Sequence, residues 1–358
     1  MTEQGTLGFG HVRPIDGAWF ARALPEEALD PDLPVIDSHH HFFAPGSLYG
    51  RQYLLDDLRA DLAGGHHVIA TVVVEAKFAY RTRGPEHLRT TGETEAIAGL
   101  AAMSESGRFG RAHVGAGIIG RTDLTSGPRL VAESLDRHLA VGGGRFRGVR
   151  DSAAYDEDPA VGLTHGGGYG RYLTPEFERG MKELAARDLS LDAWVFFHQL
   201  GDVADLARRF PDTSIVLVHC GGPLGYGRHA GRPQEIFEQW RAAMSELAGC
   251  ENVTVKLGGM LMRLAAFDYL HAERPAASWE LAPLWASYVE TCIELFGAER
   301  CMFDSNFPVE RMGVTYTALV NTFKRITSGA SVTEKGAIFA ETARRVYRLE
   351  VQDLSDVS

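Results

Sequence analysis

The 358-residue chain carries 47 acidic and 36 basic side chains, which gives a formal net charge of -11, and 45% of its residues are apolar. The acidic excess opposes broad attraction to nucleic-acid phosphates or anionic lipid, so we expect neither a nucleic-acid partner nor a membrane partner. The length and apolar content suit one barrel-sized domain or two ordinary ones.

The cysteines and the N-terminus indicate the cellular setting. Cys220, Cys250, Cys292 and Cys301 lie far apart and include no C-x-x-C pair, so neither a disulfide framework nor a structural zinc site is expected. The segment MTEQGTLGFG lacks the order of a signal peptide, and no apolar run reaches the roughly 18 residues of a membrane span. We therefore expect a soluble, cytoplasmic protein.

Secondary structure is expected to begin after an N-terminal arm, residues 1–33, which has no sustained periodicity. Short apolar or β-branched runs then recur, and they predict strands at 34–40, 68–76, 112–120, 146–150, 189–197, 214–220, 253–257 and 301–303. Segments long enough for helices separate them, at 85–106, 127–142, 175–188, 202–210 and 233–249.

This alternation predicts an α/β fold with a parallel sheet, because each return to the same edge of the sheet needs a crossover. Eight such units close naturally into a (β/α)8 TIM barrel. An open doubly wound sheet would more often carry a glycine-rich phosphate loop after its first strand, where this chain has histidines. We predict one barrel domain over residues 34–349, with a C-terminal tail at 350–358.

Polar residues follow the predicted strands, at the end of a barrel where active sites lie. In chain order they are Asp37, His39, His40, His41, Glu75, Arg150, Asp151, His198, Gln199, His219, Lys256, Asp304, Ser305 and Asn306. A single histidine among them would be more simply explained as a hydrogen-bonded loop residue, but the convergence of several predicts a functional site.

The three consecutive histidines are not equivalent. Side chains alternate between the two faces of a strand, so His39 and His41 share one face and His40 lies on the other. A pair of imidazoles on the interior face can hold one metal ion through nitrogens at about 2.0–2.1 Å.

Three motifs in this order resemble the amidohydrolase superfamily: Asp37-x-His39-x-His41, VLVHCGGP at 216–223 and CMFDSNFPV at 301–309. More narrowly, they resemble its branch of TIM-barrel hydrolases that includes 2-pyrone-4,6-dicarboxylate lactonase and the sugar-acid lactonases. The resemblance covers about residues 34–349.

The resemblance implies that histidines of the first, fifth and sixth strands and an acid of the eighth hold a divalent metal and activate water. The implied metal ligands are His39, His41, His198, His219 and Asp304, and the implied catalytic residues are Asp304, His219 and Asn306. One ion is expected, zinc before manganese. Metal-independent catalysis is the alternative, because the lactonase of this branch is regarded as working without a metal.

The chain departs from the family pattern at two places. The eighth-strand motif of relatives resembles GSDWP, which aligns its aspartate with Asn306 and its glycine with Asp304. Since an asparagine cannot accept a proton, either Asp304 serves as the base or Asn306 orients substrate or water. At the fifth strand, the histidine of relatives has two alternative alignments, with His198 or with Phe197, and a shift of one residue would turn His198 to the other face.

Four residues are candidates for substrate binding: Arg150, Lys256, Glu75 and Tyr226. The planar guanidinium of Arg150 suits a carboxylate, although pairing with Asp151 or Glu75 would equally explain it. Tyr226 lies in a glycine-rich run, 221–232, beside His219.

We therefore expect a hydrolase that opens a lactone or similar cyclic ester of a small carboxylate-bearing molecule. The enzymatic alternative is a metal-dependent decarboxylase of an aromatic or muconate-type acid. A barrel that only binds a small ligand is the alternative from another class. A homodimer is possible.

Overall fold

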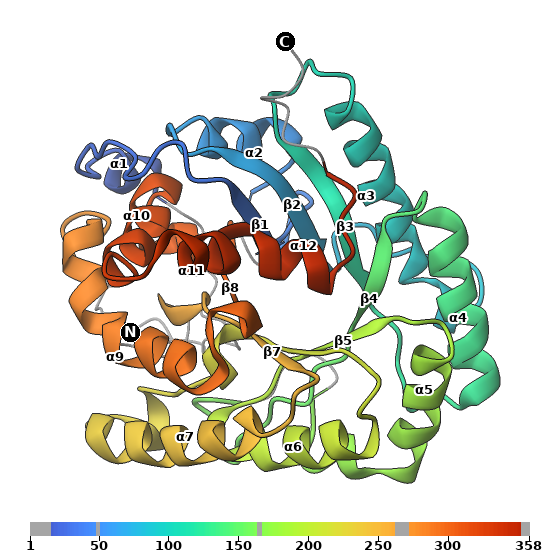
Figure 1. Cartoon of the computed structure of the whole chain (residues 1–358). Coiled ribbons are helices and arrows are strands. Elements are labelled where there is room, and N and C mark those ends of the chain that lie inside the picture. Colours follow the sequence, from blue (N-terminus) through green and yellow to red (C-terminus); the bar gives the residue numbers. More distant parts are fainter. Residues whose placement is uncertain (1–15, 48–50, 163–166, 262–271, 352–358) are drawn as a thin grey trace, which may run out of the picture.

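The structure is a computed structural model that describes residues 16–47, 51–162, 167–261 and 272–351. Its eight parallel strands pair in chain order from β1 to β8. The strands are β1 Val35–His40, β2 Val68–Val74, β3 His113–Gly120, β4 Phe146–Arg150, β5 Ser190–Ala193, β6 Ile215–Leu217, β7 Val253–Lys256 and β8 Cys301–Met302. The predicted (β/α)8 barrel is confirmed (Figure 1).

Helices surround the strands (Figure 1). They are α1 Gly17–Phe20, α2 Leu55–Leu62, α3 Thr91–Ser104, α4 Pro128–Val141, α5 Pro175–Ala185, α6 Leu200–Arg209, α7 Pro233–Ala248, α9 Ser278–Phe296, α10 Tyr316–Ile326, α11 Val332–Gly336 and α12 Thr342–Val346. Short 3-10 segments include η3 Phe197–Gln199, η4 His219–Gly221 and η5 Gly227–His229.

The sheet is closed between its first and last strands by residues beyond β8. His40 forms a parallel bridge with Phe307, and the amide of His41 donates to the Phe307 carbonyl at 2.7 Å. The Asp37 carboxylate accepts hydrogen bonds from the Ser305 hydroxyl, at 2.6 Å, and from the Ser305 amide, at 2.9 Å. These contacts hold the segment after β8 against the end of β1, where the first histidines lie.

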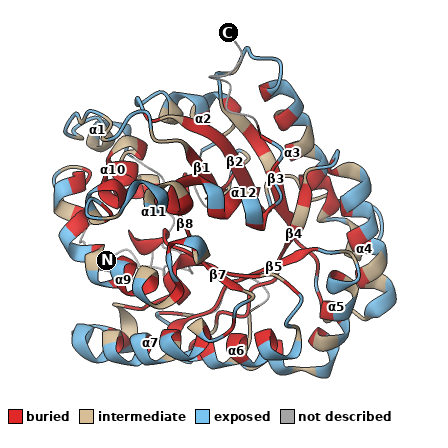
Figure 2. Cartoon of the chain, viewed as in Figure 1, coloured by how far each residue is buried: buried red, intermediate tan, exposed pale blue. Residues whose placement is uncertain are grey.

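Burial follows the barrel architecture (Figure 2). The strands are almost wholly buried, whereas the helices expose their outer faces. Inside the barrel, Ile36, Val72, Val216 and Met302 cluster with the buried ring of Tyr347, just after α12. The interior is therefore a packed core, and it supports the end of the barrel where the carboxyl ends of the strands lie.

The described part of the N-terminal arm packs on the barrel. The Trp19 indole donates to the Ala272 carbonyl at 2.8 Å, and the Leu29 amide donates to Asn321 of α10 at 2.8 Å. Residues 1–15 and 352–358 lie outside the described residues, so the division into arm, barrel and tail stays a prediction.

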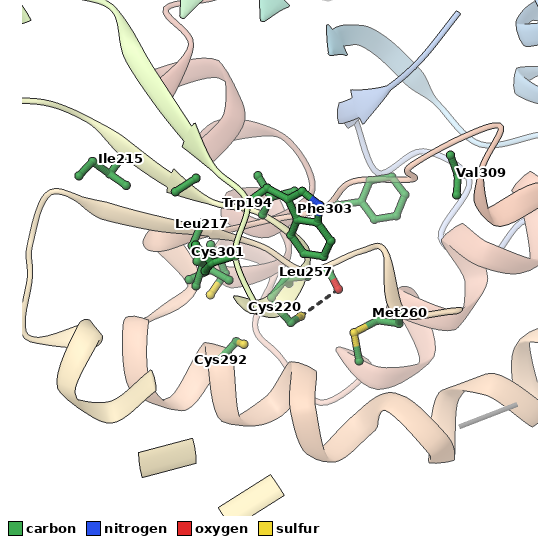
Figure 3. Close-up of a cluster of buried hydrophobic side chains, with 14 of the residues drawn as sticks. Trp194, Ile215, Leu217, Cys220, Leu257, Met260, Cys292, Cys301, Phe303 and Val309 are labelled. Carbon is green, nitrogen blue, oxygen red and sulfur yellow. Dashed lines mark hydrogen bonds between the residues drawn. The ribbon is translucent and has the colours of Figure 1, made fainter. Parts of the chain in front are cut away.

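Two predicted strands run three or more residues past the observed ends, because β5 ends at Ala193 and β6 at Leu217. The apolar residues that follow these strands, such as Trp194 and Cys220, are also buried in the core (Figure 3). Hydrophobicity alone therefore does not mark where the hydrogen-bonded pairing of the strands ends. In this core Cys220 donates to the Leu257 carbonyl at 3.2 Å, near the free thiols of Cys292 and Cys301. Among the described helices, none could cross a membrane.

Candidate active site

His39 and His41 project to the same side, as strand alternation predicts. Their Nε2 atoms lie 3.2 Å apart, whereas His40 pairs with the Thr71 hydroxyl at 2.8 Å. His41 Nδ1 lies 2.8 Å from the carbonyl of Val74, which can only accept, so Nδ1 carries the proton and Nε2 offers a lone pair. Burial lowers the pKa of His41 to about 3, which keeps the ring neutral at neutral pH.

His219 enters the site from an unusual turn after β6. Its φ of 55° and that of Cys220, 49°, lie in the left-handed region, which costs non-glycine residues free energy. The two glycines after β7 make room for this turn. A Cβ on Gly259 would lie 2.0 Å from His219 Nδ1, and one on Gly258 would lie 2.2 Å from the carbonyl oxygen of Asp304. The Gly258–Gly259 pair therefore lets His219 and Asp304 approach each other.

Asp304 is fully buried, with one carboxylate oxygen bonded to protein. Its Oδ1 accepts a hydrogen bond from the Gly258 amide, while Oδ2 lies 3.7 Å from His219 Nδ1. Burial raises the pKa of Asp304 to about 7, although the charge of Lys256 and the Gly258 amide act in the opposite direction. A carboxylate with this pKa is suited to exchange a proton near neutral pH.

His39, His219 and Asp304 form a compact donor cluster, with one potential ligand atom of each within 4.8 Å of the others. His39 Nδ1, His219 Nδ1 and Asp304 Oδ2 are buried and have no hydrogen-bond partner among the described residues. Burial, with nearby cations adding to its effect, holds the pKa of His39 and His219 well below its usual value, so both rings are neutral. Two neutral imidazoles and a carboxylate are a donor set that fits a divalent metal.

Arg150 lies beside this cluster and is held by Glu75. Its Nη2 is 2.9 Å from Glu75 Oε1 and its Nε donates to the same oxygen at 3.0 Å, while Nη1 lies 3.4 Å from His39 Nε2. Tyr80 donates to the other Glu75 oxygen at 2.9 Å. Glu75 is therefore committed to orienting Arg150, and the sequence-based expectation that Glu75 itself binds substrate has no support in these contacts.

Lys256 is placed differently from the sequence-based expectation of a substrate contact. The side chain is completely buried, and its ammonium donates to Asp192 of β5 at 2.7 Å. The Tyr347 hydroxyl donates to the same carboxylate at 3.0 Å. Lys256 thus belongs to an ion pair inside the barrel. Its positive charge lowers the pKa of both Asp304 and His39.

Asn306 lies between His41 and a buried acid. Its Nδ2 donates to Glu310 at 3.3 Å, and its Oδ1 lies 3.3 Å from His41 Nε2, so that two acceptor atoms face each other there. Asn306 has a left-handed φ of 52°, which asparagine tolerates better than most residues. This placement fits the hypothesis that Asn306 orients a partner while Asp304 handles the proton.

His198 does not lie in this cluster, in contrast to the predicted ligand set. It falls in η3 after the early end of β5, is partly exposed, and forms a separate group with Asp156 and His229. Tyr226 immediately precedes η5 and is half-buried against the core.

Sequence reasoning missed the residues that hold the site. Asp192 could have been noticed as a lone acid within an apolar strand, which predicts a buried partner. Tyr80, Glu310 and Tyr347 carry no comparable signal, because they come from segments outside the strand ends.

The family model described as Amidohydrolase matches residues 36–349. The chain is 31% identical over 342 residues to the uncharacterized protein y4mH of Sinorhizobium fredii, covering 89% of this chain and 99% of that protein. It is 26% identical over 332 residues to an L-fucono-1,5-lactonase of Burkholderia multivorans, covering 88% of this chain and 96% of that protein.

A solved structure extends the comparison. The crystal structure of an amidohydrolase from Burkholderia multivorans with bound zinc has a TM-score of 0.67 and 26% identity to this chain. The match covers 88% of this chain and 99% of that one.

Proposed function

The chain belongs to the amidohydrolase family and is a hydrolase, and from this premise we propose that it opens a lactone or similar cyclic ester of a small carboxylate-bearing molecule. Relatives named as lactonases, at 26% and 28% identity, support this reaction type. Membership of an enzyme family favours catalysis over a barrel that only binds a ligand.

The observation that carries the proposal is the buried Asp304 carboxylate facing His219. Its free Oδ2 would accept a proton from water as the water oxygen attacks the ring carbonyl carbon. When the tetrahedral intermediate collapses, the ring C–O bond breaks and Asp304 returns the proton to the departing oxygen. The product is an open hydroxy acid.

Arg150 is the residue best placed to stabilise the developing oxyanion. Glu75 fixes its guanidinium in one orientation, and Nη1 points to the edge of the cluster near His39. A donor that is already oriented lowers the barrier because it does not reorganise during the reaction. Tyr226, on the loop after β6, remains our candidate for contact with the rest of the substrate.

We propose that His39, His41, His219 and Asp304 hold one divalent ion, zinc before manganese. A zinc-bound relative of 26% identity supports this order. When bound, such an ion supplies Lewis acidity toward the carbonyl and lowers the pKa of a coordinated water. His41 suits a ligand role because the Val74 carbonyl fixes its tautomer.

The test is a panel of sugar-acid lactones, other cyclic esters and aromatic carboxylates, assayed for both proton release and carbon dioxide. The proposal predicts proton release from a lactone with no carbon dioxide. Carbon dioxide release from an aromatic or muconate-type acid would instead support the decarboxylase alternative. Elemental analysis and assays before and after chelation then decide the metal requirement of the reaction.

A further inference from the structure

A second group of metal-binding side chains lies outside the active-site cluster. Asp156 follows β4, His198 lies in η3 after β5, and His229 ends η5 in the loop after β6. Asp156 Oδ2 lies 2.9 Å from His229 Nε2 and 3.8 Å from His198 Nε2. Three loops at the same end of the barrel thus bring two imidazoles to one carboxylate.

The two histidine rings each bring one potential ligand nitrogen within 4.8 Å of the other and of an Asp156 oxygen, with the rings stacked at an interplanar angle of 13°. His198 Nε2 also lies 3.0 Å from the Tyr155 carbonyl, a hydrogen bond that an ion would replace. His229 is buried, and its Nδ1 has no hydrogen-bond partner among the described residues. On ligation the His229 proton can therefore sit on Nδ1, where no existing hydrogen bond is displaced, and the ion replaces the contact between Nε2 and Asp156.

The local charge favours a further cation. Asp156, Glu157 and Asp158 are consecutive acids. The Arg228 guanidinium contacts Asp156 and Glu157, while Asp158 accepts a hydrogen bond from the Arg228 backbone amide. One guanidinium balances only one of three carboxylates, so the surroundings remain negative. Imidazoles bind a metal ion through an unprotonated nitrogen, so the two histidines would add ligands without adding positive charge.

The Arg228 guanidinium would compete with a metal ion for the Asp156 carboxylate. Its Nε lies 3.0 Å from Asp156 Oδ1, and its Nη2 donates to Asp156 Oδ2 at 3.0 Å. Its Nε also lies 3.4 Å from His229 Nε2. Because almost half of the Arg228 side chain is exposed, it can leave toward solvent when an ion binds.

The second group is separated from the active site by aromatic rings. Trp194 packs edge-on against His219 with ring centroids 4.8 Å apart, and Phe196 lies between Trp194 and His198. No residue is shared between the two groups.

We propose that Asp156, His198 and His229 form a second divalent-cation site, selective for zinc-like ions, which ties together the loops after β4, β5 and β6. Two imidazoles and one carboxylate, completed by water, are a common zinc donor set. The guanidinium of Arg228 holds the carboxylate when the ion is absent.

The test is equilibrium dialysis of metal-stripped protein against micromolar Zn²⁺, with bound zinc measured by elemental analysis. His198→Ala and His229→Gln should each bind one zinc fewer than the unmodified protein, or bind it at least about 10-fold more weakly. Arg228→Gln should bind that zinc more tightly because the competing cation is gone. His87→Ala, which removes a histidine near the single carboxylate of Glu133, is the matched control and should bind as the unmodified protein does.

All these variants retain His39, His219 and Asp304, so zinc at the active site is the same in each. Co²⁺ substitution supplies a second readout, because its visible absorption should lose one component in His198→Ala. The proposal is overturned if His198→Ala and His229→Gln, folded by circular dichroism, bind as much zinc as His87→Ala with equal affinity.

Discussion

His219 Nδ1 lies 3.7 Å from Asp304 Oδ2, across the carboxyl ends of β6 and β8. Neither atom has a hydrogen-bond partner among the described residues. A buried carboxylate oxygen beside a neutral imidazole is costly unless a substrate, water or ion uses it. This relationship is the basis of the first prediction.

Asp304→Asn should lower kcat for the identified substrate by about 10²–10⁴-fold, the usual contribution of a positioned acid or base. The amide keeps the size of the carboxylate but cannot take a proton. Steady-state kinetics with unfolding curves check this. Asp212→Asn, at an exposed position, should leave kcat unchanged, and an active Asp304→Asn would exclude the proposed base.

Arg150→Ala should lower kcat/KM on the order of 10²-fold, the loss expected when one oriented oxyanion donor is removed. The deletion leaves a cavity beside Glu75, so added guanidinium should restore part of the activity. Kinetics at increasing guanidinium concentration measure the recovery. Equal guanidinium effects on Arg150→Ala and on exposed Arg179→Ala would contradict a direct role.

Gly259→Ala should disturb the active site, because its Cβ would lie 2.0 Å from His219 Nδ1 at a backbone φ of +73°. A displacement of about 1 Å at a catalytic group can cost about 10²-fold in rate. Gly329→Ala is the control, since a Cβ there meets nothing within 4 Å. Comparable kcat/KM values for the two variants would show that His219 needs no such space.

Lys256→Met should destabilise the fold by about 3–5 kcal/mol, because it leaves Asp192 as an unpaired charge inside the barrel. The double variant Lys256→Met/Asp192→Asn should recover part of that loss, since no charge remains buried. Urea unfolding of the single and double variants measures the coupling. Additive losses in the double variant would argue against the ion pair as the source of stability.

We expect the buried His138 to make part of the free energy of unfolding sensitive to acid. Burial lowers its pKa to about 4, and the ring donates from Nε2 to the Arg121 carbonyl at 3.0 Å while the Thr94 hydroxyl lies 2.8 Å from Nδ1. The unfolded chain takes up the proton near pH 6.5, so stability present above that pH is lost as the pH falls toward 4.

The size of this component is on the order of 3 kcal/mol at most, from a His138 pKa lowered from 6.5 to about 4. His138→Gln cannot titrate, so its free energy of unfolding should fall less between pH 7 and pH 4. Urea unfolding at several pH values compares the slopes. Parallel slopes for the two proteins would show that His138 is not the group responsible.

The barrel and the histidine pair follow from local patterns. Alternating faces of β1 separate His39 and His41 from His40, and the recurring apolar runs specify eight parallel strands. These features depend on neighbouring residues, so the sequence by itself determined them. The motif after β8 marks Asp304 and Asn306 as candidate site residues through its resemblance to the amidohydrolases.

Only the tertiary structure decided which polar residues meet. His198 lies in a second cluster because β5 ends at Ala193, five residues before it, and the intervening Trp194 is buried against His219 of another strand end. Lys256 was expected to contact the substrate, but in the structure it pairs with Asp192, a residue on another strand. Charge pairing and burial join segments far apart in the chain, so no local pattern contains them.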